Sequence, residues 1–513
     1  MTTLADLGAP VDTDVVIVGA GLSGIGAAHR LREALPHLRL QILEARGDLG
    51  GTWDLFRYPG VRSDSDMFTL AYPFSPWPEP DAIGSGRQIL DYLRRTAAEH
   101  GVDQLIRFRH RVVGAHFDTA AARWTLTVQT PQGRHERTCR FLHVCGGYYS
   151  YDQPHDPRIP GLDDFSGEVV HPQFWPTDLR YHGRRVVVIG SGATAITLVP
   201  ALVERGDDGQ VAAQVTMLQR SPTWVGSIPS RDRFADRVRR LLPPGPAHRV
   251  ARAKNVLTGF TLWALMRGAP RLARRVLTGR ATRALGGDGA ARSYVATHLT
   301  PRYDPWDQRL CATPDGAFFA TLRDGRARIL TGTIDRMVPA GVRLATGELV
   351  PADVVVTATG LRVQVAGGIE LRVDGMPVPL GEQLVWSGAM ITGLPNLAFT
   401  VGYAHASWTL RADLTARLVA RVLTWMEQRG YAVAEATPEP GLGRRRLMGL
   451  DAGYLRRAEG MLPEQGDRDP WRMRRSYPSD LLAVRRLDLD RTLTGRVPGE
   501  NQRWAGPISH PKG

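Results

Sequence analysis

Two glycine-rich turns in this 513-residue chain have the residue types and spacing that bind a dinucleotide. Residues 19–24 read GAGLSG after a β-branched run, and residues 190–195 read GSGATA after a second such run. Glycines there let the backbone approach a pyrophosphate, and the N-terminus of the following helix stabilises its charge. Because each turn joins a strand pattern to a helix pattern, we predict two dinucleotide sites.

The residue that ends the next strand distinguishes the two sites. Residues 40–43 form an apolar strand that ends at Glu44, and an acid in that position binds ribose hydroxyls. The strand of residues 215–219 ends instead in Arg220 and Ser221. An arginine can pair with a ribose 2′-phosphate through charge-assisted hydrogen bonds, although a strand-end arginine can also be an ordinary solvated charge. We expect the second site to prefer NADPH.

A third motif lies between the two turns. Residues 165–176 read FSGEVVHPQFWP, which has the spacing FxGxxxHxxxW followed by proline. Residues 50–54 (GGTWD) and 57–64 (RYPGVRSD) are rich in glycine, proline and aromatic residues without a helical period, so we expect loops. On these motifs the chain resembles the type I Baeyer-Villiger monooxygenases, a family of class B flavoprotein monooxygenases.

The resemblance is greatest to one subgroup, the thioamide-prodrug-activating monooxygenases of mycobacteria. It rests on residues 50–67, on residues 300–311 (TPRYDPWDQRLC) and on residues 401–410 (VGYAHASWTL). It is poorest at about 230–290 and beyond 430. Within the fingerprint we expect His171 to hold an interdomain linker through hydrogen bonds, and Trp175 to pack against a domain face.

The resemblance implies two cofactors, FAD at the first turn and NADPH at the second. The implied FAD contacts are Gly19, Gly21, Ser23, Gly24, Glu44, Thr52, Trp53, Asp54, Leu55, Asp64 and Val112. The implied NADPH contacts are Arg62, Ser63, Asp64, Gly190, Ser191, Gly192, Ala193, Thr194, Ala195, Ile196, Arg220 and Ser221.

The resemblance also implies the chemistry. A C4a-peroxyflavin would insert one oxygen atom into a ketone, or oxidise a sulfide or thioamide, and the cofactor would carry the reaction. Arg309 matches the family's catalytic arginine, which stabilises the anionic peroxide, and Asp64 matches its acidic partner. Many family members have a lysine before that arginine to help hold the 2′-phosphate. This chain has Gln308, so NADPH selectivity rests more on Arg220.

These motifs predict an α/β fold with two Rossmann-like dinucleotide-binding domains. Residues 353–360 (DVVVTATG) resemble the segment that closes the FAD domain after an inserted NADPH domain, so the FAD domain is expected to be discontinuous. The expected boundaries are FAD domain 1–150, NADPH domain 151–349 with a basic helical insertion at 231–290, second FAD part 350–430, and a C-terminal extension 431–513. The fingerprint is expected at the hinge between the two domains.

Composition is consistent with a multidomain globular protein. Hydrophobic residues make up 43% of the chain, and 513 residues are too many for one hydrophobic core. The three cysteines have no CxxC spacing. We therefore expect no disulfide framework and no zinc site, and a cytoplasmic protein. The N-terminus has no signal-peptide pattern, and no stretch of about eighteen apolar residues could span a bilayer.

The net charge of +14 is concentrated in one segment rather than spread as in a nucleic-acid-binding protein. Residues 231–283 contain fourteen Lys or Arg against only Asp232 and Asp236, and include an apolar run with Phe260 and Trp263. A basic amphipathic helix of this kind can lie peripherally on the inner face of a cell membrane. The alternative is a helix whose apolar side packs on its own domain.

Other functions are weighed against the same residues. A disulfide reductase needs a redox-active cysteine pair, which the sequence does not contain, and HExxH and GxxxxGK motifs are missing. A flavin-containing monooxygenase that oxidises only sulfur or nitrogen shares the scaffold but carries a different fingerprint ending, and it remains the alternative in activity. A membrane-surface NADPH-binding flavoprotein with little turnover also stays open.

Overall fold

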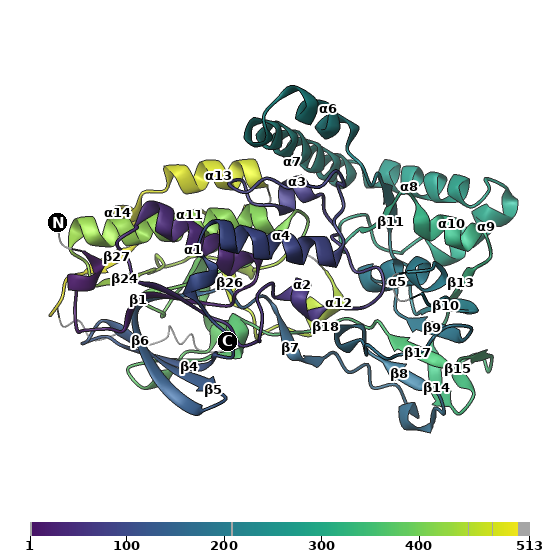
Figure 1. The fold of residues 1–513 in the computed structure, drawn as a ribbon, viewed down its shortest axis with the longest axis horizontal. Helices are drawn as coiled ribbons and strands as arrows, with labels where there is room; N and C mark the ends of the chain where they lie inside the picture. Colours follow the sequence, from purple (N-terminus) through teal and green to yellow (C-terminus); the bar gives the residue numbers. More distant parts are fainter. Residues whose placement is uncertain (1–2, 207–208, 450, 475, 501–513) are drawn as a thin grey trace.

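The computed structural model describes residues 3–206, 209–449, 451–474 and 476–500. Its fold is α/β, with two main sheets that form two units side by side (Figure 1). The first unit contains the first and the last described segments of the chain and the larger hydrophobic core. The second unit is built from the middle of the chain.

The first sheet has 13 strands and collects segments from three parts of the sequence. At its centre β1 pairs in parallel with β2 and with β6. Because β1 is buried in the sheet, its sequence is a continuous apolar run. Its strands are β1 (Thr13–Val18), β2 (Leu40–Leu43), β3 (Ile106–Arg107), β4 (Arg111–Asp118), β5 (Arg123–Thr130), β6 (Gly133–Val144), β19 (Glu370–Val373), β20 (Met376–Pro377), β21 (Leu384–Trp386), β22 (Met390–Ile391), β23 (Leu397–Phe399), β25 (Arg444–Arg446) and β26 (Glu464–Gly466).

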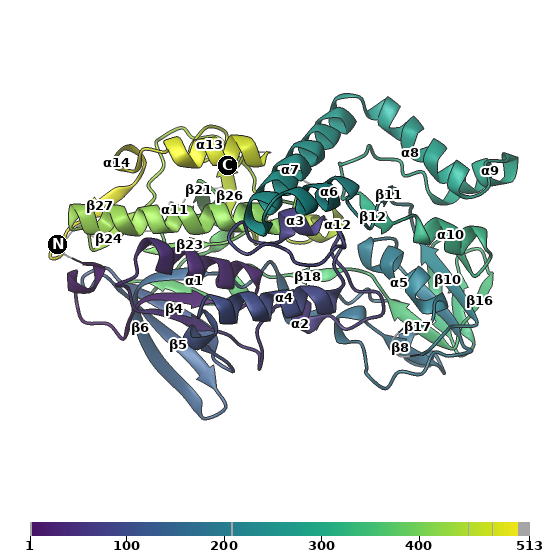
Figure 2. The same ribbon diagram turned by 45° about the horizontal axis from the view of Figure 1, so that its top comes forward.

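Helices from distant parts of the sequence cover this sheet. α1 packs along α11, and α4 lies beside them (Figure 2). The helices of the unit are α1 (Leu22–Ala34), α2 (Thr52–Leu55), α3 (Met67–Leu70), α4 (Gly86–Glu99), α11 (Trp408–Arg429), α12 (Gly453–Arg456), α13 (Tyr477–Arg486) and α14 (Leu489–Thr492), and β24 (Val433–Glu435) pairs with β27 (Thr494–Arg496).

The second sheet has five parallel strands in the order β13-β10-β9-β17-β8. It consists of β8 (Glu168–Val170), β9 (Arg185–Ile189), β10 (Gln214–Gln219), β13 (Ala327–Thr331) and β17 (Val354–Thr357). α5 (Ala193–Val203) and α10 (Ala317–Arg323) pack beside it, and β14 (Ile334–Val338), β15 (Gly341–Leu344) and β16 (Leu349–Pro351) form a small antiparallel sheet.

The strand pairing adds two details to the domain division expected from the sequence. β17 pairs with β9 in the second sheet, so this unit continues to Thr357 rather than ending at 349. The fingerprint also contributes an edge strand, because β8 pairs with β17. The segments that run between the units are β7 (Tyr149–Pro154) and β18 (Leu361–Val363), which pair with each other. His171 Nε2 lies 3.3 Å from the Gly360 carbonyl oxygen, where the chain leaves the second unit.

The basic segment forms helices between β11 (Val225–Ile228) and β12 (Cys311–Pro314). They are α6 (Arg233–Leu241), α7 (Pro244–Gly268), α8 (Pro270–Ala284) and α9 (Gly289–His298), and α6 and α7 project above the two units in Figure 1. The first half of α7 packs on α3, with Ala251 and Arg252 buried. The first half of α7 therefore packs on the first unit, whereas its second half exposes apolar side chains.

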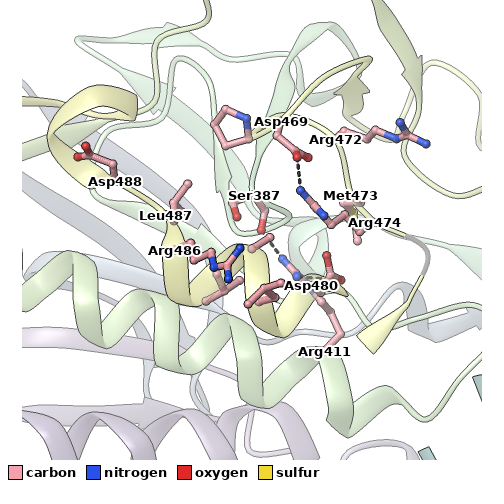
Figure 3. A pocket seen from close by; sticks show the side chains of 14 residues that line it. Ser387, Arg411, Asp469, Arg472, Met473, Arg474, Asp480, Arg486, Leu487 and Asp488 are labelled. Atoms are coloured by element: carbon pink, nitrogen blue, oxygen red, sulfur yellow. Dashed lines mark hydrogen bonds and ion pairs between the residues drawn. The ribbon is translucent and has the colours of Figure 1, made fainter. Parts of the chain in front are cut away.

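The C-terminal extension is anchored by a buried ion pair. Arg411 of α11 lies 3.2 Å from Asp480 of α13, and both side chains are almost fully buried (Figure 3). The Tyr403 hydroxyl donates a hydrogen bond to the same Asp480 oxygen at 2.5 Å. β25 and β26 extend the first sheet, so this segment is part of the first unit. Residues 501–513 of the expected extension lie outside the described part.

Candidate functional site

The first glycine turn has the tight geometry that its sequence predicted. Gly19 has φ of 102°, a left-handed conformation that favours glycine. A Cβ atom on Gly24 would lie 1.8 Å from the Gly19 carbonyl oxygen, so α1 can approach β1 only with glycine there. Gly21 is the N-cap of α1, and Ser23 accepts a hydrogen bond from Trp408 Nε1 at 2.8 Å.

Glu44 lies at the end of β2 and faces the same turn. Its carboxylate accepts hydrogen bonds from the backbone N–H of Ala20 at 2.7 Å and of Arg46 at 2.8 Å. Burial raises the pKa of Glu44 above its ordinary value, and the two N–H donors oppose that shift. Each oxygen keeps a free lone pair, so the carboxylate can still accept hydroxyl donors.

The loop residues after this turn have mixed roles. Thr52 lies 2.7 Å from the Tyr149 hydroxyl, and Trp53 packs partly buried against the first core. Asp54 is buried between Arg46 and Arg57 at 2.6 and 2.8 Å, so it stabilises the loop. Leu55 is buried in α2, whereas Val112 is buried in β4 as part of the first core.

The second turn has free space at its second glycine, Gly192, where the corresponding Gly21 of the first turn lies against Gly51. Gly190 has φ of 139°, and a Cβ atom there would lie 2.3 Å from the Ala358 carbonyl oxygen. A Cβ atom on Gly192, the N-cap of α5, would meet nothing within 4 Å, which leaves room for a ligand. Ser191 donates a hydrogen bond to the Ser221 carbonyl oxygen at 3.0 Å.

The residues beside the second turn lie in the first turn of α5 and directly after β10. Arg220 and Ser221 follow β10 and are exposed. The first helical turn of α5 presents the partly exposed Ala193 and Thr194 before the buried Ala195 and Ile196. The turn, an exposed cation and a helix N-terminus are thus brought together, as a phosphate-bearing nucleotide requires.

The RYPG loop connects the two units. Gly60 packs on α5 so closely that a Cβ atom would lie 2.7 Å from Ala201 Cβ. Arg62 donates hydrogen bonds to Thr197 Oγ1 and to the Ala312 carbonyl oxygen, both at 2.9 Å. Ser63 is buried and accepts a hydrogen bond from Gly84 N. Arg62 and Ser63 therefore fix the loop in the structure, and their expected NADPH contacts stay predictions.

This loop places Asp64 beside Arg309. Arg309 Nη2 lies 3.5 Å from Asp64 Oδ2, and Arg62 Nη1 lies 3.9 Å from Asp64 Oδ1. The surrounding protein partly desolvates Arg309, although 47% of its side chain is exposed, and its pKa is raised above the ordinary value because the Asp64 carboxylate attracts the guanidinium. Arg309 therefore stays protonated across the physiological pH range.

Two tyrosines that the sequence analysis did not single out, Tyr148 and Tyr454, both act electrostatically on Arg309, and their rings lie 6.4 Å apart. Tyr148 also stacks on Trp408 at 5.4 Å. The YYSY run at 148–151, soon after a buried strand, is the signal that could have identified Tyr148.

A cavity of about 490 Å³ lies on the same side of the first unit. Its lining residue Ala404 packs against the same small cluster, Ala452 and Leu455, as Tyr454 does. Trp263 of α7 closes part of it by stacking on His405 at 4.8 Å. A separate hollow of about 320 Å³ lies beside Asp480, between the C-terminal segment and α11 (Figure 3). Apolar and aromatic lining residues of the larger cavity include Trp263, Trp306, Tyr403, Met448 and Met473.

The residues fit the two cofactors that the motifs predict. The second turn leaves space for a ligand at Gly192, and two buried polar atoms, Trp306 Nε1 and Thr359 Oγ1, have no hydrogen-bond partner among the described residues. A buried donor without a partner is costly and is usually satisfied by a ligand or water. The three cysteines are buried and unbonded, and none belongs to a dithiol pair.

Comparison with known proteins relates the chain to flavin enzymes. Residues 12–235 match the family model Flavin-binding monooxygenase-like. The chain is 45% identical over 480 residues to FAD-containing monooxygenase EthA of Mycobacterium tuberculosis, covering 93% of this chain and 96% of EthA. It is 42% identical to the probable FAD-binding monooxygenase AlmA of Acinetobacter baylyi, covering 93% of this chain and 94% of AlmA.

A solved structure with the same architecture is that of an oxidized steroid monooxygenase bound to NADP. It is 26% identical to this chain with a TM-score of 0.68, and the match covers 83% of this chain and 88% of the other. The likeness extends over both units, so the paired arrangement of two nucleotide turns is shared as well as the individual sheets.

Proposed function

The chain belongs to the FAD-containing, flavin-binding monooxygenases, and from that premise we propose that it inserts one oxygen atom into ketones and also oxidises sulfides and thioamides. The protein is an NADPH- and O2-dependent flavin monooxygenase that acts on a small molecule. FAD, once reduced by NADPH, supplies the activation of oxygen.

The observation that carries the ketone assignment is the Arg309–Asp64 pair. Attack on a ketone requires an oxygen nucleophile that stays anionic, whereas oxidation of sulfur proceeds with a protonated oxygen donor. A guanidinium that stays charged stabilises the anion, and the carboxylate of Asp64, at 3.5 Å, holds it in place. This electrostatic arrangement supports ketone insertion without preventing sulfur oxidation.

The other residues bind and orient the reactants. We assign FAD to the first turn with Glu44, and NADPH to the second turn with Arg220. Arg62 fixes the loop that carries Asp64 to α5 and β12, so it keeps the charged pair in register with both sites. The lining of the larger cavity combines apolar and aromatic side chains with Arg267, Arg445, Arg446 and Arg474, which supports a substrate with an apolar body and a polar group.

Product analysis tests this function. Purified holoenzyme is supplied with NADPH, ¹⁸O2 and a panel of linear ketones, cyclic ketones, aryl sulfides and thioamides. We expect mass spectrometry to show esters or lactones that carry one labelled oxygen atom, together with sulfoxides. Labelled sulfur products with no ester from any ketone would contradict the assignment and favour the monooxygenase that acts only on sulfur or nitrogen.

A second proposal concerns where the enzyme acts, and it rests on the exposed half of α7. Leu257 and Leu265 each have an exposed fraction of 64%, and Phe260 and Leu262 beside them are also exposed. Among the described residues, the nearby Arg249, Arg271 and Arg275 make no ion pair. The pairs formed within the insertion include Lys254–Asp232, Arg267–Asp307 and Arg274–Asp304.

We propose that this face binds the surface of an anionic membrane. Exposed apolar side chains flanked by free cations match the acyl boundary and the headgroups of such a surface. No helix among the described residues is long and apolar enough to cross a bilayer, so the proposed contact is peripheral. The cations favour an anionic lipid surface over an apolar protein partner.

Vesicle co-sedimentation checks this contact. The holoenzyme is expected to bind phosphatidylglycerol-containing vesicles at low salt, and binding should weaken at high salt because the arginine attraction is screened. The double variant Leu257→Ser, Leu265→Ser should bind about tenfold more weakly or worse, because it removes apolar area that enters the membrane. Leu349→Ser, at an exposed leucine outside the insertion, is the control. If the double variant bound these vesicles as strongly as the unmodified protein does, the proposal would be contradicted.

A further inference from the structure

Two arginines flank the second glycine turn at the carboxyl edge of its sheet. Arg220 directly follows β10, and Gly360 follows β17, with β9 and its turn between these two strands. Arg457 directly follows α12, far along the sequence, and its Nη2 atom lies 3.9 Å from the Cβ position of Gly360. Because the carboxyl ends of parallel strands meet at one edge of a sheet, both arginines belong to the edge that carries the turn.

Neither cation is neutralised by the described residues. No ion pair or hydrogen bond joins the side chain of Arg220 or Arg457 to an acid there, whereas the neighbouring Arg456 forms an ion pair with Asp451. Burial and the charge of Arg220 both lower the pKa of Arg457. Holding two like charges together is unfavourable unless an anion binds between them.

We propose that Arg457 is a second cation of the NADPH 2′-phosphate site, acting together with Arg220. The inference rests on the proposed assignment of NADPH to the second turn. The phosphate carries about 1.5 to 2 negative charges near neutral pH, which two guanidinium groups match better than one. It also accounts for Gln308, where the resemblance to related enzymes led us to expect a cation.

This site would connect cofactor recognition to the catalytic arginine. Tyr454 lies three residues before Arg457 in the same short segment and acts electrostatically on Arg309. A phosphate held by Arg457 therefore fixes the C-terminal segment against the second unit, and with it one wall around Arg309. Arg457 acts as a specificity and positioning residue and has no part in oxygen transfer itself.

Equilibrium binding to the FAD holoenzyme tests the proposal without turnover. Calorimetric titration with 2′,5′-ADP and with 5′-AMP compares the unmodified protein with Arg457→Gln, Arg220→Gln and the control Arg456→Gln. In Arg457→Gln the Kd for 2′,5′-ADP is expected to rise about tenfold to a hundredfold, because a charge-assisted hydrogen bond is lost. The Kd for 5′-AMP should not change, and Arg456→Gln should bind both ligands normally.

The outcomes separate this inference from its premise. If the unmodified protein does not prefer 2′,5′-ADP to 5′-AMP, the NADPH assignment falls and the role of Arg457 falls with it. If the preference exists and Arg457→Gln keeps it in full, only the role of Arg457 is overturned. An equal loss of both ligands in Arg457→Gln would also overturn it, because it would indicate a disturbed fold rather than a lost phosphate contact.

Discussion

Arg309→Ala should lower the rate of oxygen transfer by about 10²- to 10³-fold while the enzyme continues to oxidise NADPH. A preorganised charged group aimed at developing negative charge is worth that much in enzymes, and Arg309 is the cation of this site. NADPH oxidation does not need that stabilisation, so its electrons should reduce O2 to hydrogen peroxide. Ester formation by mass spectrometry and peroxide by a coupled assay measure the two fates together.

Two further variants separate charge from geometry. Arg309→Lys keeps a cation but loses the planar guanidinium group, so its rate of oxygen transfer should lie between those of the unmodified enzyme and Arg309→Ala. Asp64→Asn should lower oxygen transfer in the same direction by a smaller factor, because the arginine stays but is less well held. Arg323→Gln, on the exposed surface of α10, is the control. Coupled oxygenation in Arg309→Ala would refute the mechanism.

The nucleotide-binding parts of the fold were predictable because they depend on local sequence. Gly19 and Gly190 adopt left-handed backbone conformations that only glycine tolerates well, so their requirement is visible in the sequence. The strand before each turn is buried on both faces, which gives it a continuous apolar run. The predictions for the α/β class and the two-domain FAD and NADP architecture are confirmed.

Long-range pairing is the part that local sequence does not encode. The expected boundary at 349 precedes β17 because β17 reads like any buried parallel strand, and only its pairing with β8 and β9 assigns it to the second sheet. The fingerprint was expected at the hinge, and local sequence did not show that β8 within it forms an edge strand of that sheet. In both cases the strand is assigned by hydrogen bonds to a segment about 170 or more residues away, which local sequence does not specify. The contact of His171 with Gly360 is another example.

In the candidate site, too, some features were predictable from the sequence and others depended on long-range contacts. The proximity of Asp64 and Arg309 came from the resemblance, and the structure places them 3.5 Å apart. For Arg62 and Asp54 the structure adds protein partners that local sequence did not reveal, Thr197 for Arg62 and Arg46 and Arg57 for Asp54, and their expected cofactor contacts stay predictions. Tyr454 and Arg457 were out of reach, because they come from the region where the resemblance is poorest.

Asp480→Asn is expected to destabilise the first unit by about 3 to 5 kcal/mol, the usual cost of leaving one partner of a buried ion pair without its counterion. Asparagine keeps the shape of the side chain and can still accept a hydrogen bond from Tyr403, so the loss reports mainly the uncompensated charge of Arg411. Urea unfolding followed by tryptophan fluorescence measures it. Glu459→Gln, in the exposed pair with Arg446, should cost about 1 kcal/mol or less.

A paired substitution decides whether charge is the cause. In Arg411→Met, Asp480→Leu both charges are removed, and apolar replacement of a buried pair is often nearly neutral, so most of the stability should return. If this double variant is as unstable as Asp480→Asn, the ion pair is not the cause and the packing of α13 on α11 is. Recovered stability with altered substrate affinity would instead show that Asp480 acts on the larger cavity through Tyr403, which lines it. The C-terminal extension would then shape the substrate pocket as well as close the fold.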